Sequence, residues 1–449
     1  MKKLNLAIFC LFFVGCYYAS QTEGDPDPLP PCSSDDECDD GVDCTLDICT
    51  LDGCVWIDEC AEPTECSSDD ECDDGVDCTV DYCAVTGICQ HVDLCEDPEC
   101  SSEIQTIQLP TPAVQMDVGI SNAQIALAWR ESSHDLSPGY FSVFSLPDPP
   151  EEAAAVLLGE AEGHGTHHIH LLWHEPNFRA FWSSFDGSAS SIKMASISSA
   201  GTGITDPVTL YDAHHASLSE VVMHPSGELG IAWSDWAEPG ANAMAYFGRF
   251  SLYGETLEIL PIGETDYSYG PRLVATEEGY AMSYTDYEDL DGISDVKARE
   301  YSFSHGLGHS LRLNGDESNF YASAIAEMND ERLVLWHWAM TADIRSLYAS
   351  WIRDGENIGV IMLDVVSKNV RALSFPENDE AVVAWCTPPL PDTPGAVKAV
   401  RVKNWSVTLI MYQELSHECS DVRIAKLEDQ PMIFWLDSEH KVSYRSLCY

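Results

Sequence analysis

A cluster of histidines is the first group of residues in this chain whose types and spacing could support chemistry. Five lie within eleven residues: His164, His167, His168, His170 and His174. Neutral imidazoles are good ligands for zinc and copper. Because alternate residues of a strand share one face, we expect His168, His170 and His174 to point the same way, with His167 opposite. Either a zinc or copper site or a row of surface and channel-lining histidines would explain the cluster.

An acidic loop is the second candidate metal site. Asp286, Asp289 and Asp291 lie close together, with Glu288 between them and Gly292 after them. Carboxylate oxygens are the ligands that calcium prefers, although the spacing here departs from the EF-hand pattern. The segment therefore predicts either a calcium site or an ordinary solvated loop.

The cysteines carry a different kind of chemistry. Two stretches share the same fourteen residues, C-S-S-D-D-E-C-D-D-G-V-D-C-T, beginning at Cys32 and at Cys66. Each stretch opens a unit of six cysteines, too short to build a core of its own and typical of modules held together by disulfides in an oxidising compartment. Six cysteines imply three disulfides per unit, and fifteen connectivities stay open.

These two units resemble the cysteine-rich repeat of the CTDC type known from slime-mould extracellular proteins. The matching segments are C-D-D-G at 38–41 and 72–75, and the segments C-T-L-D-I-C at 44–49 and C-T-V-D-Y-C at 78–83. The resemblance implies an extracellular spacer or adhesion module without catalytic activity.

The N-terminus and the charge predict export. Lys2 and Lys3 precede an apolar run at 4–14, which is typical of a secretory signal. The end of that run, F-V-G-C, resembles a bacterial lipobox, which implies a lipid on the thiol of Cys16; a simple secretory signal is the alternative. The net charge of −53 argues against nucleic-acid binding and against charge-driven binding to anionic membranes.

After residue 100 the sequence predicts strands, and these strands must position any functional site in that part of the chain. An apolar run that ends in an aromatic residue recurs seven times, each between an upstream strand and an alternating downstream strand. The runs are 125–129, 169–173, 229–233, 280–284, 333–338, 381–385 and 432–435. Seven units of about 50 residues with four strands each predict an all-β, seven-bladed β-propeller, with six or eight blades as alternatives. We expect the aromatic residues to pack between blades.

The chain end suggests how the ring closes. The last unit ends after its third strand, and residues 104–109 can supply the missing outer strand. Cys100 precedes this closing strand and Cys448 follows its expected partner, so we predict a Cys100–Cys448 disulfide. Cys386 and Cys419 fall on one face of neighbouring blades, and we predict a second disulfide between them.

One blade carries a weaker family resemblance. The segment S-Y-T-D at 283–286, followed by Asp291, Gly292, Asp295 and Arg299, resembles the blade repeat of bacterial secreted propellers. The resemblance supports the propeller fold and implies no activity.

The sequence predicts five segments: a signal peptide (1–15), a lipidated tether (16–31), two cysteine-rich repeats (32–61 and 62–99) and a propeller (100–449). We expect a monomeric lipoprotein of the outer membrane or cell surface of a bacterium, with secretion as the alternative. Its propeller would bind an extracellular protein or glycan. A sialidase-like or other glycosidase and a structural surface spacer are the alternative functions.

Catalytic signatures decide between binding and catalysis. The sequence has no G-x-S-x-G, H-E-x-x-H, phosphate-binding loop, Rossmann fingerprint or sialidase Asp box. A sialidase-like site needs an arginine cluster, a tyrosine nucleophile and an acid. The arginines of the blades are spread along the sequence, at Arg130, Arg179, Arg272, Arg299, Arg371 and Arg423. We therefore expect no enzyme, while an arginine cluster or acid pair facing the channel would favour one.

Overall fold

The computed structural model describes residues 104–447 apart from short loop gaps, together with the backbone of four strands in the first hundred residues. Contacts divide the chain into two units, Met1–Glu96 and Asp97–Tyr449. Cys16, Cys100, Cys448 and the metal candidates His164, Asp289 and Asp291 lie outside the described residues, so the predictions that rest on them stay predictions. Within the described part, no helix is long and apolar enough to cross a membrane.

The described strands of the first unit form two hairpins, one in each cysteine-rich repeat. They are β1 (Thr45–Thr50) with β2 (Gly53–Asp58), and β3 (Thr79–Cys83) with β4 (Cys89–Asp93). The register places Cys49 opposite Cys54 in the first hairpin and Cys83 opposite Cys89 in the second. The two copies of the repeat therefore form the same hairpin, with equivalent cysteines opposite each other in the strand register.

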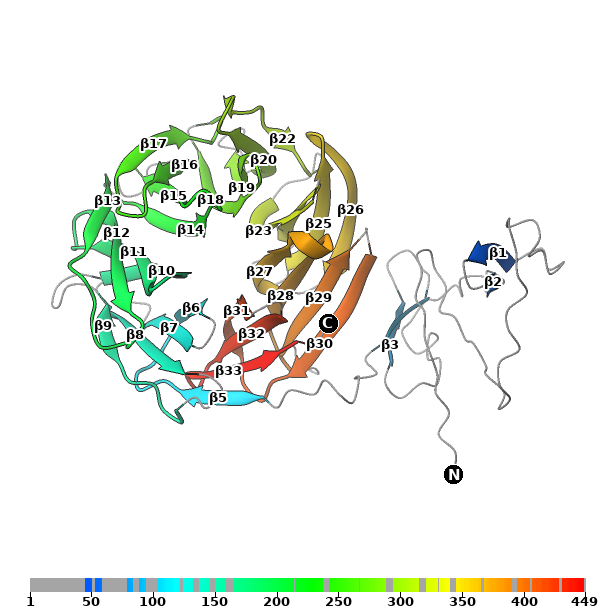
Figure 1. Cartoon of the computed structure of the whole chain (residues 1–449), viewed down its shortest axis with the longest axis horizontal. Helices are drawn as coiled ribbons and strands as arrows, with labels where there is room; N and C mark the ends of the chain where they lie inside the picture. Colours follow the sequence, from blue (N-terminus) through cyan, green and yellow to red (C-terminus); the bar gives the residue numbers. More distant parts are fainter. Residues whose placement is uncertain are drawn as a thin grey trace. The chain divides into compact units, whose positions relative to one another are not determined.

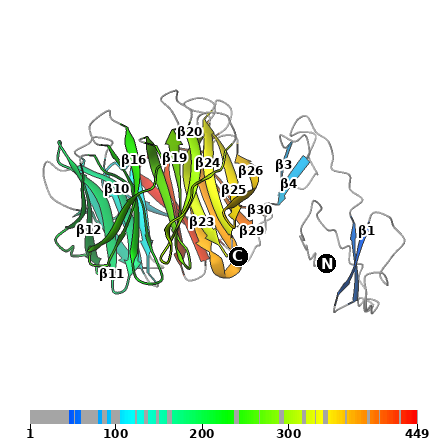
Figure 2. The same ribbon diagram turned by 90° about the horizontal axis from the view of Figure 1, so that it is seen from above.

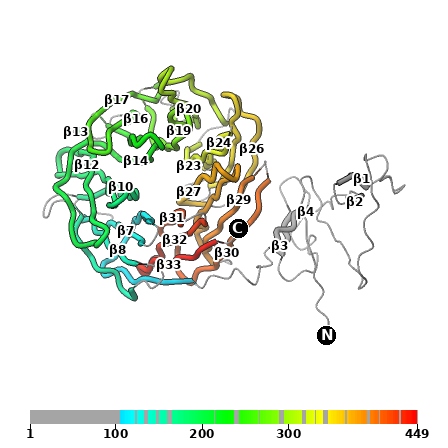
Figure 3. The backbone as a smooth tube through the Cα atoms, viewed as in Figure 1, coloured from blue at the N-terminus to red at the C-terminus, as the bar shows by residue number. Residues whose placement is uncertain are grey.

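The second unit is a seven-bladed β-propeller, which confirms the predicted fold class (Figure 1). Each blade is an antiparallel sheet whose first strand lies innermost, and Figure 3 traces the chain around the ring blade by blade. Figure 2 shows the ring from its side, where the strands run between its two faces.

The strands of the first four blades are as follows. The first blade has β6 (Gln115–Ile120), β7 (Gln124–Arg130), β8 (Gly139–Ser145) and β9 (Val156–Leu158). The second has β10 (Gly165–His174), β11 (Asn177–Phe185), β12 (Ser190–Ser198) and β13 (Val208–Ala213). The third has β14 (Ser217–Met223), β15 (Leu229–Trp236), β16 (Ala243–Phe250) and β17 (Thr256–Pro261). The fourth has β18 (Ser268–Ala275), β19 (Gly279–Tyr287), β20 (Ser294–Ser302), β21 (Gly306–Leu307) and β22 (Leu311–Arg312).

The last three blades complete the ring. The fifth blade has β23 (Phe320–Met328), β24 (Glu331–Ala339), β25 (Arg345–Arg353) and β26 (Glu356–Asp364). The sixth has β27 (Lys368–Phe375), the 3-10 helix η3 (Pro376–Asn378), β28 (Glu380–Thr387), β29 (Ala396–Lys403) and β30 (Ser406–Glu414). The seventh has β31 (Cys419–Leu427), β32 (Gln430–Asp437), β33 (Lys441–Ser446) and, from the start of the domain, β5 (Gln105–Gln108).

The strand β5 closes the ring. It pairs antiparallel with β33, from Gln108 opposite Lys441 to Gln105 opposite Tyr444, and Figure 1 shows it at the outer edge of the seventh blade. This pairing covers an edge that would otherwise expose unpaired backbone groups. The seventh blade is therefore assembled from both ends of the domain.

The second blade corrects one strand assignment. Residues 169–173 lie in the innermost strand β10, and residues 178–185 form the second strand β11, although they were expected one strand further out. The aromatic residue of this blade is therefore Trp182. It follows Trp129 by 53 residues and precedes Trp233 by 51, which removes the irregular spacing around Trp173. Both strands contain an apolar run that ends in a tryptophan, and periodicity alone cannot show which of the two runs is the second strand of the blade.

Six of the expected aromatic residues are core residues, and in the second blade Trp182 takes the place of the expected Trp173, which is only partly buried. All seven core aromatic residues are buried, with at most 5% of each side chain exposed: Trp129, Trp182, Trp233, Tyr284, Trp336, Trp385 and Trp435. Burying a large apolar side chain stabilises a fold by roughly 1.5–3 kcal/mol. These residues therefore account for much of the packing within and between blades and are not available for chemistry at the surface.

The residue after each aromatic connects its blade to the next one, and we call these contacts the blade clasps. Most are polar. Ser183, Ser234 and Thr285 accept backbone N–H bonds from the next blade at 2.8–3.0 Å. Two others use side chains on both sides. Arg130 donates to His167 at 2.6 Å, and Nε2 of His337 lies 2.8 Å from the Ser367 hydroxyl.

The clasp between the sixth and seventh blades is covalent. Cys386, which follows Trp385, forms a disulfide with Cys419 at the start of β31, as the sequence predicts. The seventh blade differs because Leu436 takes the equivalent position and packs in the core between the seventh and first blades.

Candidate binding site in the central channel

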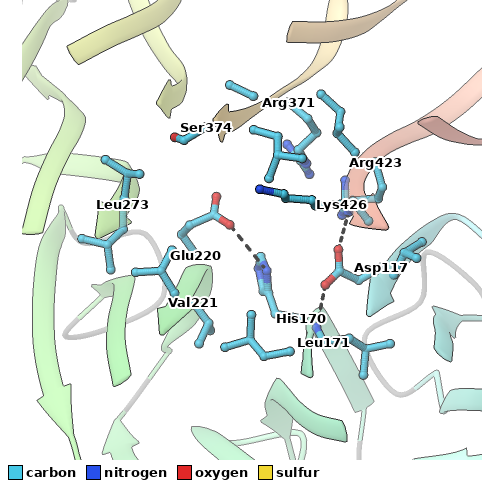
Figure 4. A pocket seen from close by; sticks show the side chains of 18 of the residues that line it. Asp117, His170, Leu171, Glu220, Val221, Leu273, Arg371, Ser374, Arg423 and Lys426 are labelled. Carbon is cyan, nitrogen blue, oxygen red and sulfur yellow. Dashed lines mark hydrogen bonds and ion pairs between the residues drawn. The ribbon is translucent and has the colours of Figure 1, made fainter. Parts of the chain in front are cut away.

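A cavity of about 440 Å³ lies in the middle of the ring. It is lined by residues of all seven innermost strands, so every blade contributes to its wall (Figure 4). A concave site of this size can hold a small organic molecule.

One residue of each innermost strand occupies an equivalent position around the channel. In register, it lies opposite the residue that precedes the buried aromatic of its blade. We call these seven residues the belt: Asp117, His170, Glu220, Arg272, Ala324, Arg371 and Arg423. Six of the seven are ionisable, whereas most of the buried side chains elsewhere in the propeller are apolar.

A β-bulge precedes the belt in six of the seven innermost strands; β6 pairs without one. Each bulge inserts one extra residue, and a positive φ marks three of them, at His168, Gly270 and Asn369. A bulge bends a strand and changes the direction of the side chains beside it, and bulges are common next to functional sites. The repeated irregularity therefore positions the belt side chains.

Two belt residues, Arg423 and Asp117, form a closely paired group with the nearby carboxylate of Asp421, and we call this group the closed arc. The Nε of Arg423 donates to Asp117 at 2.7 Å, and its Nη1 donates to Oδ1 of Asp421 at 2.8 Å. Asp117 also accepts the backbone N–H of Leu171 at 2.6 Å (Figure 4). Asp421 accepts the N–H of Met116 at 3.2 Å. These bonds join the seventh, first and second blades.

Burial perturbs the carboxyl of Asp117 in spite of this pairing. Its removal from water raises the pKa to about 6, although Arg423 and the bond from Leu171 act in the opposite direction. Burial also holds the pKa of His170 well below its ordinary value, and the charge of Arg423 adds to this effect. His170 is therefore neutral at pH 7, while Asp117 is close to its titration range.

Glu220 links the neutral histidine to the next cation around the belt. One of its carboxylate oxygens lies 3.7 Å from His170 Nδ1, and the other lies 3.8 Å from Arg272 Nη1. Arg272 also donates to the backbone oxygen of Ser219 at 3.2 Å. These contacts are longer than those of Arg423, so the charge of Arg272 is only partly compensated.

Ala324 and Arg371, on the fifth and sixth blades, form the adjoining part of the belt, which we call the open arc. Arg371 Nη1 donates to the backbone oxygen of Val370 at 2.9 Å, and its Nη2 lies 4.0 Å from Asp421 Oδ1, the oxygen that Arg423 already uses. Burial and the neighbouring charge of Arg423 lower the pKa of Arg371 to about 10. The cation of the open arc therefore has a weak, shared counter-charge.

Two further donor atoms of the arginines have no partner in the described part of the chain. They are Nη2 of Arg423 and Nε of Arg272, both of which are buried. A buried polar atom without a hydrogen bond is costly, and such atoms call for an explanation when they occur at a possible ligand site.

The metal candidates are not brought together within the described residues. His170 belongs to the belt, His168 sits in the bulge with a φ of 49°, and His174 ends β10 opposite Asn177. The bulge interrupts the alternation that would have set three histidines on one face. Among the described residues, no group of three or more histidine, cysteine or carboxylate side chains is placed to hold a metal.

Asp286 has a structural partner instead. It is fully buried, lies 2.7 Å from Lys297 Nζ and accepts the hydroxyl of Thr265 at 2.7 Å. Zinc or copper binding at the histidines and calcium binding at this loop stay predictions.

Sequence reasoning missed the belt because the arginines seemed scattered. Arg272, Arg371 and Arg423 occupy the same belt position on the fourth, sixth and seventh blades. A signal was present: the belt residue comes twelve residues before the buried aromatic in five blades, and thirteen or fourteen before it in the third and sixth. To find the belt from the sequence, one must know the correct buried aromatic residue in each blade. One must also allow for the extra residue that a bulge adds to the spacing.

Comparisons with known proteins support the fold and no more. No family model and no curated protein matches the chain. Among solved structures, the WD40 domain of Toxoplasma gondii coronin is similar with a TM-score of 0.50 and 10% identity, covering 77% of this chain and 86% of that one. The propeller domain of the Trilobed protease from Pyrococcus furiosus is similar with a TM-score of 0.45 and 9% identity, covering 74% and 97%. A neuraminidase-like protein (A/little yellow-shouldered bat/Guatemala) gives 0.40 and 10%, covering 64% and 94%.

Proposed function

We propose that this chain is an exported binding protein whose propeller takes a small ligand, or one end of a larger one, into the central channel. One observation carries the proposal: five ionisable belt side chains from five blades, Asp117, His170, Glu220, Arg371 and Arg423, line a cavity of about 440 Å³, and Arg272 holds the equivalent position on a sixth blade. Binding sites are typically concave and apolar, with a few convergent polar groups that fix the ligand.

The cost of burying charges separates this proposal from that of a surface spacer. Replacing a buried ion pair with well-packed apolar residues is often neutral or stabilising. A channel with a purely structural role would therefore be filled most simply by apolar side chains, as most of the space between the blades is. The belt instead keeps three arginines and two carboxylates, which favours a role in recognition.

The compartment and the anchor belong to the same proposal. The expected signal peptide, lipidation of Cys16 and cysteine-rich repeats would hold the propeller outside the cytoplasm, at the outer membrane or surface of a bacterium. The Cys386–Cys419 disulfide supports this, since structural disulfides are typical of oxidising compartments. The cysteine-rich repeats would then act as a spacer between the lipid and the binding domain.

A carbohydrate-active enzyme is the second candidate, and the convergence of Arg272, Arg371 and Arg423 favours it. Asp117, whose pKa burial raises to about 6, would be the acid of such a site. Among the described lining residues, however, there is no tyrosine to act as the nucleophile of a sialidase. Hydrolysis of a glycan by the purified chain, lost in Asp117→Asn, would replace the binding proposal with this one.

A plugged channel tests the binding proposal directly. The purified full chain is screened on arrays of glycans, peptides and small metabolites, beside the variants Val222→Trp and Val360→Trp. Val222 lines the cavity, whereas Val360 is 46% exposed on the outermost strand β26. We expect ligands of the wild type to be lost in Val222→Trp and kept in Val360→Trp. Equal binding by both variants, or no ligand for a folded wild type, would contradict the proposal.

A further inference from the structure

We propose that the open arc of the belt is a seat for a carboxylate, which binds Arg371 in the space that the small side chain of Ala324 leaves free. This inference rests on the proposed function for the existence of a ligand, and it names the chemical group that the ligand must carry.

The contacts around the belt are interrupted in one sector. Arg423 contacts Asp117, and Asp117 accepts the backbone N–H of Leu171, the residue after His170. His170 contacts Glu220, and Glu220 contacts Arg272. Ala324 follows on the fifth blade and has only a methyl group to offer. Arg371, on the sixth blade, has Asp421 at 4.0 Å as its carboxylate contact, and that contact comes from outside the belt. A carboxylate placed between these two positions would complete the series.

The donors that such a carboxylate needs are present. Arg371 lines the cavity with 23% of its side chain exposed, so a ligand in the channel can reach it. Arg423 is 4% exposed, yet its Nη2 is buried without a hydrogen-bond partner in the described part of the chain. The two guanidiniums share Asp421 Oδ1, which places them next to each other. A guanidinium presents paired N–H groups that match the two oxygens of a carboxylate.

The charge balance favours a group with one negative charge. Three guanidiniums, of Arg272, Arg371 and Arg423, lie near three carboxylates, of Asp117, Glu220 and Asp421. The further lining cation, Lys426, is paired with Glu377. Two of the three carboxylates bind Arg423, so the deficit is local to the open arc. A monoanion would compensate Arg371 without reversing the charge of the site, whereas a dianion would approach Glu220 and Asp117 with excess charge. The rest of the ligand would contact the apolar lining residues Leu171, Val221 and Leu273.

A carboxylate built into the protein tests the seat without knowledge of the ligand. Ala324→Glu places a negative charge beside Arg371, and Ala324→Gln adds nearly the same volume without the charge. We expect the melting temperature of the glutamate variant to exceed that of the glutamine variant by at least about 2–4 °C at pH 7 and low ionic strength. The difference should shrink as salt screens the pair. Equal melting temperatures for the two variants would overturn the proposal, and since both share any cost of added volume, poor packing cannot hide the result.

Added anions provide the second measurement. Sodium D-glucuronate, D-glucose and sodium sulfate are titrated into the full chain and into Arg371→Gln and Arg353→Gln, with the melting temperature as readout. We expect glucuronate to raise the melting temperature of the wild type and of Arg353→Gln, whose arginine lies at the end of β25 outside the cavity, but not that of Arg371→Gln. A larger response to sulfate than to glucuronate, or equal responses to glucuronate and glucose, would overturn the carboxylate seat.

The two proposals can fail separately. Ligands that bind equally well to Val222→Trp would end the channel-binding function and leave the comparison of the two Ala324 variants valid. A ligand that is lost in Val222→Trp but binds Arg371→Gln with unchanged affinity would keep the channel as the site and overturn the seat.

Discussion

The closed and open arcs of the belt are built on the same backbone geometry and differ in how their charges are compensated. Arg423 and Arg371 hold equivalent positions on neighbouring strands, each opposite the residue before a buried tryptophan. Arg423 lies 2.7 and 2.8 Å from carboxylates of two blades. Arg371 has one carboxylate at 4.0 Å, shared with Arg423. An arginine at the same level of the channel thus links neighbouring blades in the case of Arg423. In the case of Arg371 it has only a weak carboxylate partner beside the cavity.

The difference shows how a repeat fold separates structure from recognition. The repeated strand and bulge determine where a belt side chain lies. The neighbouring side chains determine the role of each belt residue. The guanidinium of Arg423 lies between two carboxylates and stabilises the fold, whereas that of Arg371 lies next to Ala324 in the belt and has N–H groups available to a ligand. Position in the repeat therefore predicts a place in the channel, but not a role.

The largest expected effect comes from applying one substitution to both arginines. Arg423→Met leaves Asp117 and Asp421 buried without their close cation, and breaking a buried pair in this way costs about 3–5 kcal/mol. Arg371→Met removes a loosely paired cation, and we expect a loss below about 1 kcal/mol. Urea unfolding of the two variants measures both values. Equal losses would mean that the two arcs do not differ in the way the distances indicate.

The disulfide beside these arginines tests whether the closed arc also depends on a covalent clasp. Replacing both Cys386 and Cys419 with serine removes a cross-link between residues 33 positions apart. We expect the free energy of unfolding to fall by about 2–4 kcal/mol. The matched control is Ser234→Ala at the equivalent clasp of the third blade, where the loss of one hydrogen bond should cost about 1 kcal/mol. A smaller loss for the cysteine pair than for Ser234→Ala would contradict the expected order.

The smallest expected effect is the pH dependence of the closed arc. The groups around Asp117 are Arg423, Arg371, Glu220 and the N–H of Leu171, and burial outweighs the cations to raise its pKa from 3.8 to about 6. A carboxyl with a raised pKa takes up a proton on folding, so its contribution to stability grows as the pH falls from about 7 toward 4. Between pH 7 and 5 we expect the wild type to gain about 1 kcal/mol relative to Asp117→Asn.

The same titration should affect the open arc. Neutral Asp117 leaves the site with more positive charge, so the binding of D-glucuronate should strengthen between pH 7 and 5 in the wild type and stay level in Asp117→Asn. Calorimetric titration at the two pH values measures this. If the affinity for D-glucuronate fell as the pH is lowered, the protonation of Asp117 would not promote anion binding at the open arc, and the expected electrostatic coupling of the two arcs would be contradicted.

Much of the fold can be predicted from the sequence because its signals are local. Each blade repeats an apolar run with an aromatic end, and the run keeps its period even where other residues change. The prediction was wrong in the second blade, where Trp173 on β10 resembles the true repeat residue Trp182 on β11. Two adjacent apolar strands of similar length carry the same periodic signal, and only their pairing distinguishes them.

The sequence by itself determined the seven-bladed ring, the strand that closes it and the cysteine pair at the sixth and seventh blades, because each follows from strand periodicity and from the order of strands within a blade. Only the tertiary structure decided the site. Arg272, Arg371 and Arg423 lie about fifty to one hundred and fifty residues apart, and they meet because ring closure brings the first strand of every blade to one axis. The bulges then shift six of the seven innermost strands by one residue before the belt, so which side chains share a level depends on pairings that local sequence does not encode.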